Sequence, residues 1–459
     1  MTQRTFHILT FGCQMNVNDS SWLARSLVQH GFTESGIDRA GVVILNTCSV
    51  RDKPEQKVYS ALARIRHETR HTPGAFAVVA GCVAQQIGSG FFDRFPQVRL
   101  VVGGDGLAMA PQAIESLCED NSLRLNLTDF STVYPERDPA LPESGADIPP
   151  VAYVNIMQGC DNFCAYCIVP YTRGRQKSRS AAAILDECRA LLANGAKEIT
   201  LLGQNVDSYG LDAGAAGCPS FAQLLRSVAE LPGLHRLRFV SVHPKDMDPE
   251  VIAMFGEYPN ICPRLHLPLQ AGSDAVLARM RRQYTMAKFM EIVDALRRAR
   301  PDIALSTDLI VGFPGETDAQ FEETLEAMRR VKFMSSFSFC YSDRPGTAAS
   351  RIVNKVLPTV KARRLEILQA LQEELSAVWL RSMVGRETDI LLEGTSRRQT
   401  GTDGESWQGR DPWGDVVNVT LPPGIGAVGQ ILPVRLDGAK KHSLTGTVLK
   451  NHQTCELGG

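Results

Sequence analysis

The chain has 459 residues, of which 44% are hydrophobic and 22% charged, and its formal net charge is −1. This is the composition of a soluble globular protein of about three domains. The near-zero charge excludes a global attractive field for nucleic acid, so any such contact must use local basic patches.

No apolar stretch approaches the roughly 18 residues that a membrane-spanning helix requires. The N-terminus lacks the charged and apolar segments of a signal peptide. We therefore expect a cytoplasmic protein without a membrane partner. In that compartment the 12 cysteines are expected to serve metal or redox chemistry rather than a disulfide framework.

Residues 4–122 are predicted to form an α/β domain. A helical stretch over residues 18–32 has Asp19 or Ser20 as its predicted N-cap. Short apolar strands joined by helices indicate a parallel sheet covered on both faces. Four apolar runs have the length of such strands, and they span residues 6–13, 41–48, 76–82 and 98–104.

Three cysteines occupy equivalent positions in this first domain. Cys13, Cys48 and Cys82 each end a predicted strand and lie 35 and 34 residues apart. The carboxyl ends of parallel strands share one edge of a sheet, so the three thiols are expected to converge there. Three thiolates can hold a cubane iron–sulfur cluster and leave one iron open. The alternative is that they are ordinary buried residues.

A linker is predicted over residues 123–150, because residues 131–150 contain five prolines and show no periodic pattern. Residues 151–377 then repeat strand and helix six times, and a long helix from residue 359 to about 378 leads out of this region. Six units predict an open, incomplete βα barrel with its active site at the carboxyl ends of the strands. The predicted strands span residues 152–158, 198–205, 236–243, 262–270, 302–313 and 335–342.

A second group of cysteines, Cys160, Cys164 and Cys167, follows the first barrel strand. Thiolates are soft ligands for zinc or iron–sulfur clusters, and three of them on a cubane leave one iron free to bind a small molecule. The alternatives are a zinc site with a distant fourth ligand and coincidental core cysteines. The other six cysteines have no partner at ligand spacing and are expected to be inert: Cys118, Cys188, Cys218, Cys262, Cys340 and Cys455.

This Cys-x3-Cys-x2-Cys spacing after the first strand of a six-unit barrel resembles the radical S-adenosylmethionine superfamily. The resemblance implies that the open iron binds the methionine part of S-adenosylmethionine, and that the reduced cluster cleaves it to a deoxyadenosyl radical. It also implies a set of cofactor contacts: Tyr166 beside the adenine, Gly203 and Gln204 near the methionine part, and Asp308 and Gly312 near the ribose and adenine.

The tail, residues 378–450, is predicted to form a small OB-like β-barrel, a fold that often binds nucleic acid. Trp407 and Trp413 either stack on bases or pack within this domain. The predicted strands span residues 387–394, 416–421, 429–438 and 444–450.

Both cysteine triads, their order and the tail together resemble the methylthiotransferases over nearly the whole chain, and the tail is similar to that family's RNA-binding TRAM domain. Within the family the resemblance is closest to the bacterial enzymes that make 2-methylthio-N6-isopentenyladenosine beside the tRNA anticodon. The motifs that carry it are "GCQMNVNDS", "LNTCSVRDKPEQKV", "AGCVAQ", "GCDNFCAYCIVPYTRGR", "LLGQNVDSYG", "SVHPKD", "LHLPLQAGSD" and "YSDRPGTAAS".

The resemblance implies two [4Fe–4S] clusters, with S-adenosylmethionine as both methyl donor and radical source. The cluster held by the first triad presents a methylated sulfur, and the cluster held by the second triad produces the radical that activates C2 of the base, chemistry that side chains alone do not supply. The implied partners are the tRNA anticodon loop and a low-potential electron donor such as flavodoxin or ferredoxin. We expect a monomer.

Four basic residues, Arg173, Arg175, Lys177 and Arg179, lie within seven positions just after the second triad. They could hold the phosphates of the anticodon loop, or form a solvated loop or salt bridges within the barrel. No catalytic side chain is assigned.

Two other functions remain open on the sequence alone. One is the same chemistry on threonylcarbamoyladenosine tRNA or on a ribosomal-protein aspartate. The other is a non-catalytic iron–sulfur protein that binds RNA as a sensor.

Overall fold

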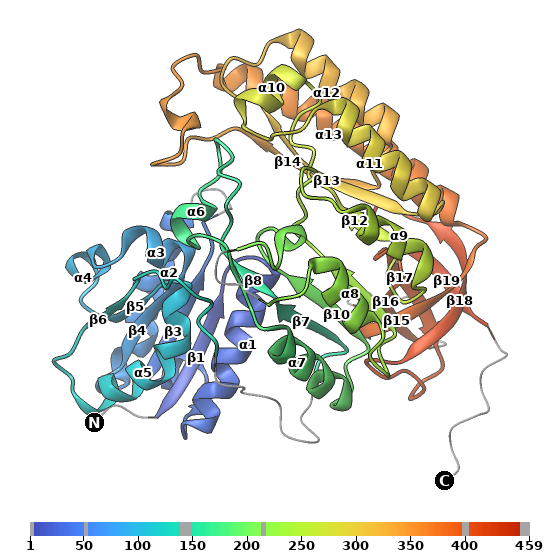
Figure 1. The fold of residues 1–459 in the computed structure, drawn as a ribbon. Coiled ribbons are helices and arrows are strands. Elements are labelled where there is room, and N and C mark those ends of the chain that lie inside the picture. The colour runs from blue at the N-terminus through green and yellow to red at the C-terminus, as the bar shows by residue number, and fades with distance from the viewer. Residues whose placement is uncertain (1–3, 50–53, 138–147, 213–216, 397–403, 450–459) are drawn as a thin grey trace.

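The computed structural model describes residues 4–49, 54–137, 148–212, 217–396 and 404–449. Three parts follow one another along the chain: an α/β domain, a half-open βα barrel and a small β-barrel (Figure 1). Residues 138–147 of the predicted linker and residue 450 of the predicted tail lie outside the described residues. Within the described ranges, none of the helices combines the length and the apolar character that a membrane span needs.

The first domain is a parallel sheet with helices on both faces, as predicted. Its six strands are ordered β2-β1-β3-β4-β5-β6. Alternate side chains of β3 enter two separate cores: Val42 and Ile44 one, Val43 and Leu45 the other. The elements are β1 (Thr5–Thr10), α1 (Gln14–Gln29), β2 (Thr33–Glu34), β3 (Val42–Thr47), α2 (Pro54–Glu68), β4 (Phe76–Gly81), α3 (Cys82–Ile87), α4 (Gly90–Arg94), β5 (Val98–Val102), α5 (Ala110–Glu119) and β6 (Leu125–Leu127).

Two predictions for this domain differ from the structure. Helix α1 begins at Gln14 with Cys13 at its N-cap, so Asp19 and Ser20 are interior positions and not caps. The Cys13 side chain makes no capping hydrogen bond to the helix, and cysteine is not among the residues that favour this position, so the sequence carries no capping signal there. In addition, β6 pairs with β5, which extends the sheet beyond the predicted boundary at residue 122.

The central domain contains the six predicted strand–helix units. Its strands form two parallel three-stranded sheets, β11-β10-β7 and β12-β13-β14, and an isolated bridge between Leu237 and Ile261 connects their neighbouring edges. A short antiparallel pair of strands, β8 (Met157–Gln158) and β9 (Lys177–Ser178), flanks the helix α6 (Val169–Thr172). The six strands are β7 (Val151–Asn155), β10 (Glu198–Leu202), β11 (Arg236–Phe239), β12 (Arg264–His266), β13 (Ala304–Val311) and β14 (Ser335–Cys340).

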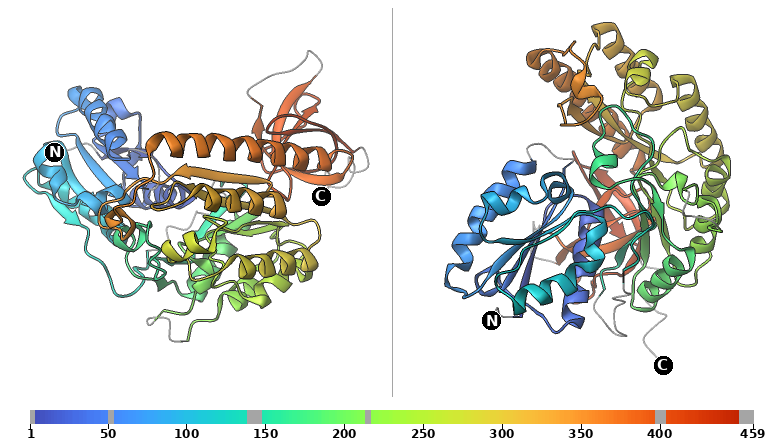
Figure 2. Two further views of the ribbon diagram at one scale, coloured as in Figure 1. Left: turned by 90° about the horizontal axis from the view of Figure 1, so that it is seen from above. Right: turned by 60° about the vertical axis from the view of Figure 1, so that its left-hand side comes forward.

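Helices cover the outer side of this half barrel, and the first domain lies against its inner side (Figure 2). A single core unites the strands with the helices around them. The helices are α7 (Ala181–Ala193), α8 (Phe221–Ala229), α9 (Pro249–Glu257), α10 (Asp274–Arg279), α11 (Met286–Ala299), α12 (Asp318–Val331) and α13 (Pro358–Met383).

The tail forms a closed five-stranded barrel in the order β15-β16-β17-β19-β18. Strand β16 was not predicted, because its residues "ESWQGR" contain one apolar side chain and so show no strand pattern. Because α13 continues to Met383, the barrel begins nine residues after the predicted boundary at 378. Its strands are β15 (Glu387–Thr395), β16 (Glu405–Arg410), β17 (Val416–Leu421), β18 (Ile431–Ala439) and β19 (Leu444–Val448).

The small barrel is attached to the amino ends of the central strands. Arg236, the first residue of β11, donates hydrogen bonds to the Arg410 carbonyl at 2.8 Å and to Asp389 Oδ2 at 2.9 Å. The Trp413 indole donates to the Asp302 carbonyl at 2.8 Å, just before β13. The small barrel therefore does not cover the carboxyl ends of the central strands, which is where βα barrels carry their active sites.

Candidate functional site

The first cysteine triad lies at one edge of the first sheet. Cys13 follows β1, Cys48 follows β3 and Cys82 follows β4, and these three strands are neighbours in the sheet. The backbone brings the first two close together, since a Cβ placed on Gly12 would be 2.7 Å from the Cys48 Cβ. The convergence expected from the spacing is therefore present in the fold.

The thiols of this first triad differ in exposure, and the surroundings of Cys13 favour its thiolate. Cys48 and Cys82 are buried, whereas Cys13 is exposed. A hydrogen bond with Cys48 lowers the pKa of Cys13 to about 6, although burial of the thiol acts in the opposite direction, and the charge of Arg173 lowers it further. A thiolate at neutral pH is the form that binds iron, so this position is prepared for a metal.

The second triad lies on the loop between β8 and α6. The Cys160 amide donates to the Gly174 carbonyl at 3.3 Å, and the Cys167 amide donates to the Cys164 carbonyl at 3.0 Å. Gly159 has φ +81°, and a Cβ there would lie 2.0 Å from the Arg175 carbonyl oxygen. Only glycine fits this close approach of two backbone segments.

Two basic side chains lie beside the middle cysteine. Arg282 Nη1 donates to Cys164 Sγ at 3.3 Å, and His243 Nε2 is 3.9 Å from the same sulfur. Burial, together with the charges of Arg282 and Lys245, lowers the pKa of His243 to about 2, so its imidazole is neutral. The predicted strand end at His243 therefore belongs to the triad's surroundings.

The outer cysteines of this loop are protonated at neutral pH. Burial raises the pKa of Cys160 to about 11 and that of Cys167 to about 12, and the neighbouring cysteine Cys164 contributes to both shifts. Binding of a metal by these thiols would therefore release their protons, since thiolates are the form that coordinates metals.

The donor sets fit iron–sulfur clusters better than a single metal ion. Each triad offers three sulfurs, the soft ligands that such clusters use. Within the residues that the structure describes, no three His, Cys, Asp or Glu side chains are placed to hold one ion. His243, 3.9 Å from Cys164 Sγ, is a candidate for the distant fourth zinc ligand considered above, but among the described residues it completes no such group. A cubane spreads three thiolates over three irons, so it does not require them to meet at one ion.

Three of the predicted cofactor residues surround the second triad. Tyr166 packs against the central core, and burial raises its pKa well above the usual value. Gln204 Oε1 accepts a hydrogen bond from the Gly159 amide, next to Cys160. A Cβ on Gly203 would lie 2.5 Å from Met157 Cγ, so the β10 turn packs directly under the loop.

The other two predicted cofactor residues belong to the second sheet. Asp308 on β13 is 3.3 Å from His266 Nε2, measured to its Oδ1. The Gly312 amide donates to Glu316 Oε2 at 2.6 Å. His266, the last residue of β12, is therefore in contact with the Asp308 carboxylate of the neighbouring strand β13.

The basic run after the second triad does not form one surface. Arg173 and Lys177 are buried, with 4% and 2% of their side chains exposed, and each pairs with a carboxylate, Asp19 and Asp105 respectively. Their charges are used inside the protein, which corrects the expectation that they hold phosphates of the anticodon loop. Arg179 is largely buried against two glutamates.

Arg175 is the exposed member of the run, with 73% of its side chain accessible. Its guanidinium makes two hydrogen bonds to Asp161, at 2.6 and 3.1 Å, and lies over the Phe163 ring at 5.3 Å. Phe163 itself is exposed. Arg175 thus remains available at the outer rim of the triad loop.

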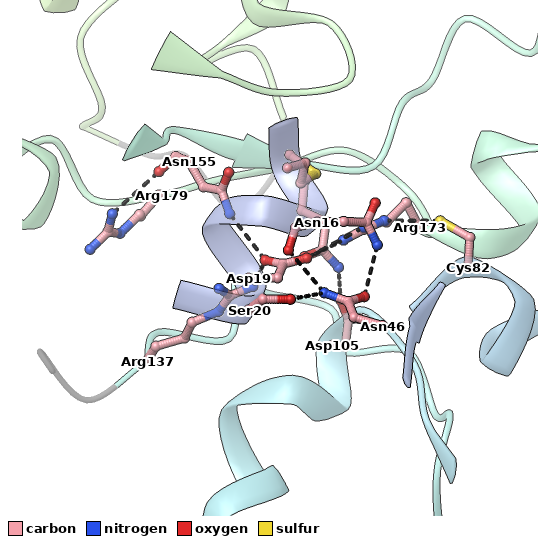
Figure 3. Close-up of polar contacts among 12 residues, drawn as sticks. Asn16, Asp19, Ser20, Asn46, Cys82, Asp105, Arg137, Asn155, Arg173 and Arg179 are labelled. Carbon is pink, nitrogen blue, oxygen red and sulfur yellow. Dashed lines mark hydrogen bonds and ion pairs between the residues drawn. The ribbon is translucent and has the colours of Figure 1, made fainter. Parts of the chain in front are cut away.

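A buried polar network at the interface between the first two domains was not foreseen from the sequence (Figure 3). Asp19 Oδ1 accepts hydrogen bonds from Arg137 at 2.7 Å and from Asn155 at 3.4 Å. Its Oδ2 lies 3.4 Å from Arg173 Nη1. The Nε of Arg173 donates to Cys82 Sγ at 3.3 Å. The one available signal was a charged residue within the apolar pattern of α1, but its partners are more than 100 residues away.

The remaining candidates have structural positions. Trp407 and Trp413 are buried, 7% and 8% exposed, so neither offers a face for base stacking. Cys340 packs against the outside of the central core. Among the other cysteines without assigned ligands, Cys118, Cys188 and Cys262 are buried and Cys218 is partly exposed, while Cys455 lies outside the described residues.

Comparison with known families identifies two segments of the chain. The Radical SAM superfamily matches residues 154–328, and the Uncharacterized protein family UPF0004 matches residues 5–103. The first segment contains the second triad, and the second contains the first triad.

Curated relatives match over nearly the full length. The tRNA-2-methylthio-N(6)-dimethylallyladenosine synthase of Nitratidesulfovibrio vulgaris (Hildenborough) is 62% identical over 97% of this chain and 98% of the relative. The proteins of the same name from Lawsonia intracellularis and Geobacter sulfurreducens are 58% and 43% identical, over 97% and 98% of this chain and 98% of each relative.

Among solved structures, the radical S-adenosylmethionine methyltransferase TsrM from Kitasatospora setae, with cobalamin and a [4Fe–4S] cluster bound, is similar with a TM-score of 0.55 and 16% identity. The match covers 76% of this chain and 77% of that one. The cobalamin-dependent radical enzyme OxsB has a TM-score of 0.52 and 13% identity, over 81% of this chain and 56% of its own. At these identities the likeness concerns the fold alone.

Proposed function

The chain belongs to the family of tRNA-2-methylthio-N(6)-dimethylallyladenosine synthases, and from that premise we propose which of its residues carry the reaction. The enzyme is a radical S-adenosylmethionine methylthiotransferase that modifies C2 of N6-isopentenyladenosine next to the tRNA anticodon. Its cofactors are S-adenosylmethionine and [4Fe–4S] clusters. We set aside the other substrates considered above, threonylcarbamoyladenosine tRNA and a ribosomal-protein aspartate, and the role of a non-catalytic sensor. The relatives that define the family carry the name of a dimethylallyladenosine-modifying enzyme instead.

Cys160, Cys164 and Cys167 are proposed to hold the cluster that binds S-adenosylmethionine. The sequence that contains them matches the radical superfamily, and they lie at the carboxyl-end side of the half barrel. Tyr166, Gly203 and Gln204 are proposed to contact the cofactor from around this loop, and Asp308 and Gly312 from the opposite sheet.

Cys13, Cys48 and Cys82 are proposed to hold the second cluster. The carrying observation is that two contacts join the two triads across one interface. Arg173, six residues beyond Cys167, donates to the Cys82 sulfur at 3.3 Å. Gln204, which accepts from the amide next to Cys160, donates to the Met15 sulfur at 2.8 Å, two residues from Cys13.

Held by the cysteines of the two triads, the clusters together with S-adenosylmethionine would supply the radical and sulfur-transfer chemistry that the family's reaction needs. The chain's own part is to hold the two donor sets at one interface, since reacting groups gain rate when they are fixed close together. Burial of Cys48, Cys82 and Cys164 limits the access of water to the sulfurs. The Arg282 guanidinium fixes the middle sulfur of the second triad.

The substrate is a tRNA, and we propose that Arg175 contacts its anticodon-loop backbone. Arg175 is exposed at the rim of the triad loop, beside the accessible ring of Phe163. A guanidinium suits a phosphate, and an exposed aromatic ring suits an unstacked base. A cytoplasmic location, a low-potential electron donor such as flavodoxin or ferredoxin, and a monomeric chain complete the proposal.

The ligand assignment is tested by iron and sulfide content after anaerobic reconstitution. Wild type is expected to hold about eight irons, and a variant with alanine at all three cysteines of either triad about four. Cys118→Ala is the matched control for the first domain, because Cys118 is a buried thiol of the same domain without ligand role, and it should keep about eight. Unchanged iron in the variant lacking Cys13, Cys48 and Cys82 would contradict the second site.

A further inference from the structure

One guanidinium joins the two domains at the first triad. Arg173 is the C-cap of α6 in the central domain, yet its side chain contacts groups of the first domain. Nε donates to Cys82 Sγ at 3.3 Å, and Nη1 and Nη2 lie 3.4 and 3.5 Å from Asp19 Oδ2 (Figure 3). Arg173, a residue of the central domain, thus bridges the Cys82 sulfur and the Asp19 carboxylate, which both belong to the first domain.

The surroundings allow this side chain little freedom. The Arg173 side chain is 4% exposed and that of Asp19 is 3% exposed. Gly104 leaves the space that the arginine occupies, since a Cβ there would be 3.3 Å from Arg173 Cδ. Asp19 is held in turn by Arg137 at 2.7 Å and by Asn155 at 3.4 Å. A charge buried this deeply is tolerated because it is paired and hydrogen-bonded.

The contact to sulfur has an electronic consequence. Hydrogen bonds to cluster sulfurs and nearby charge are two of the factors that set the reduction potential of an iron–sulfur cluster. Arginine keeps its charge at all accessible pH values, and its planar fork fixes the direction of its donors. A positive charge at the ligand sulfur stabilises the reduced, more negative cluster.

We propose that Arg173 is a positioning residue for the cluster of the first triad. Its Nε–H holds the Cys82 sulfur, and its charge raises the reduction potential of that cluster. Asp19 fixes the guanidinium in this position. The inference rests on the proposed assignment of this cluster. Because Arg173 belongs to the central domain, the potential of a cluster in the first domain depends on how the two domains are docked.

The test is a redox titration followed by electron paramagnetic resonance on the full-length chain. Alanine at Cys160, Cys164 and Cys167 leaves one cluster to observe, and iron content of about four confirms it. In this background Arg173→Met is expected to shift the midpoint to a more negative value, with at least a tenfold change in the oxidised-to-reduced ratio, or 59 mV for one electron. Arg173→Lys keeps the positive charge but lacks the planar guanidinium, so its midpoint potential should lie between those of the parent and Arg173→Met.

Two controls separate the contact from general surface or interface charge. Arg137→Met removes the other arginine that pairs with Asp19. Within the described part of the chain its hydrogen bond goes to this carboxylate and not to a sulfur, so the variant should shift the potential less than Arg173→Met. Arg189→Gln removes an exposed charge on α7 and should shift nothing. Loss of iron from both Arg173 variants, with full iron in Arg137→Met, would also support the proposal.

Two results overturn the proposal: an Arg173→Met variant with about four irons and the parent's potential, or equal shifts in Arg173→Met and Arg137→Met. If the parent without Cys160, Cys164 and Cys167 binds no iron at all, the assignment of the cluster fails instead, and the two failures are distinguished by the iron content.

Discussion

Replacing Gly159 by alanine should damage the second triad more than any other single methyl group added near it. The residue has φ +81°, and the added Cβ would lie 2.0 Å from the Arg175 carbonyl oxygen and 2.7 Å from that of Gly174. Both are backbone atoms, so the loop must move by about 1 Å or more to reach the roughly 3.0 Å that real contacts keep. Cys160 is the next residue and moves with it.

The loss of stability expected for Gly159→Ala has two parts, one from the backbone conformation and one from the close contact. A left-handed backbone costs a non-glycine residue about 1–2 kcal/mol, and overpacking against fixed atoms costs about 1–3 kcal/mol more. Gly195→Ala is the matched control, because Gly195 has φ +99° and nothing within 4 Å of the added Cβ. It should lose only the backbone part, so the two variants should differ by about 1–3 kcal/mol in the free energy of unfolding.

Thermal unfolding of both variants, with iron content after reconstitution, measures the two effects. Each kcal/mol corresponds to roughly 2–4 °C for a domain of this size. Gly159→Ala should melt below Gly195→Ala and bind iron poorly at the second triad, while Gly195→Ala should bind it fully. Equal melting temperatures with full iron in both would refute the claim that the glycine is required by the close packing of the loop.

Three further predictions concern buried and exposed charges. Lys177→Met should lower the free energy of unfolding by about 3–5 kcal/mol in denaturant titrations, because it leaves the buried Asp105 carboxylate without its cation. An unchanged free energy of unfolding would contradict a stabilising role for this ion pair. Burial and the nearby charge of Asp415 raise the pKa of Asp411 to about 7. The free energy of unfolding of wild type should therefore fall as pH rises from about 4 through 7, and Asp411→Asn should show a weaker dependence on pH. The same pH dependence in both proteins would contradict the raised pKa. Arg175→Gln should weaken tRNA binding and reduce its salt slope by about one without changing iron content; an unchanged slope would remove Arg175 from the interface.

The sequence predicted the positions of both triads for different reasons. Cys160, Cys164 and Cys167 form a local motif, so short-range spacing sufficed. Cys13, Cys48 and Cys82 are far apart in sequence, and their convergence followed from the rule that parallel strands end at one edge. Both predictions depend on backbone topology, which hydrophobic patterning reports well.

The basic run after the second triad could not be interpreted in the same way. Four neighbouring cations look alike in sequence, yet Arg173 and Lys177 are buried and only Arg175 is well exposed. Their partners, Asp19 and Asp105, lie 154 and 72 residues away. Pairing over such separations is decided by domain docking, which no local pattern encodes. Asp19 shows the same effect, since a residue suited to an N-cap serves instead as a buried acceptor at an interface.

The central claim is that this chain installs the methylthio group and needs both triads to do so. Nucleoside mass spectrometry of tRNA from a deletion strain complemented with wild type, or with alanine at the three cysteines of either triad, tests it most directly. We predict that wild type restores the 2-methylthio nucleoside, whereas both variants accumulate N6-isopentenyladenosine. Restoration of the methylthio nucleoside by either variant, or its persistence in the deletion strain, would contradict the account.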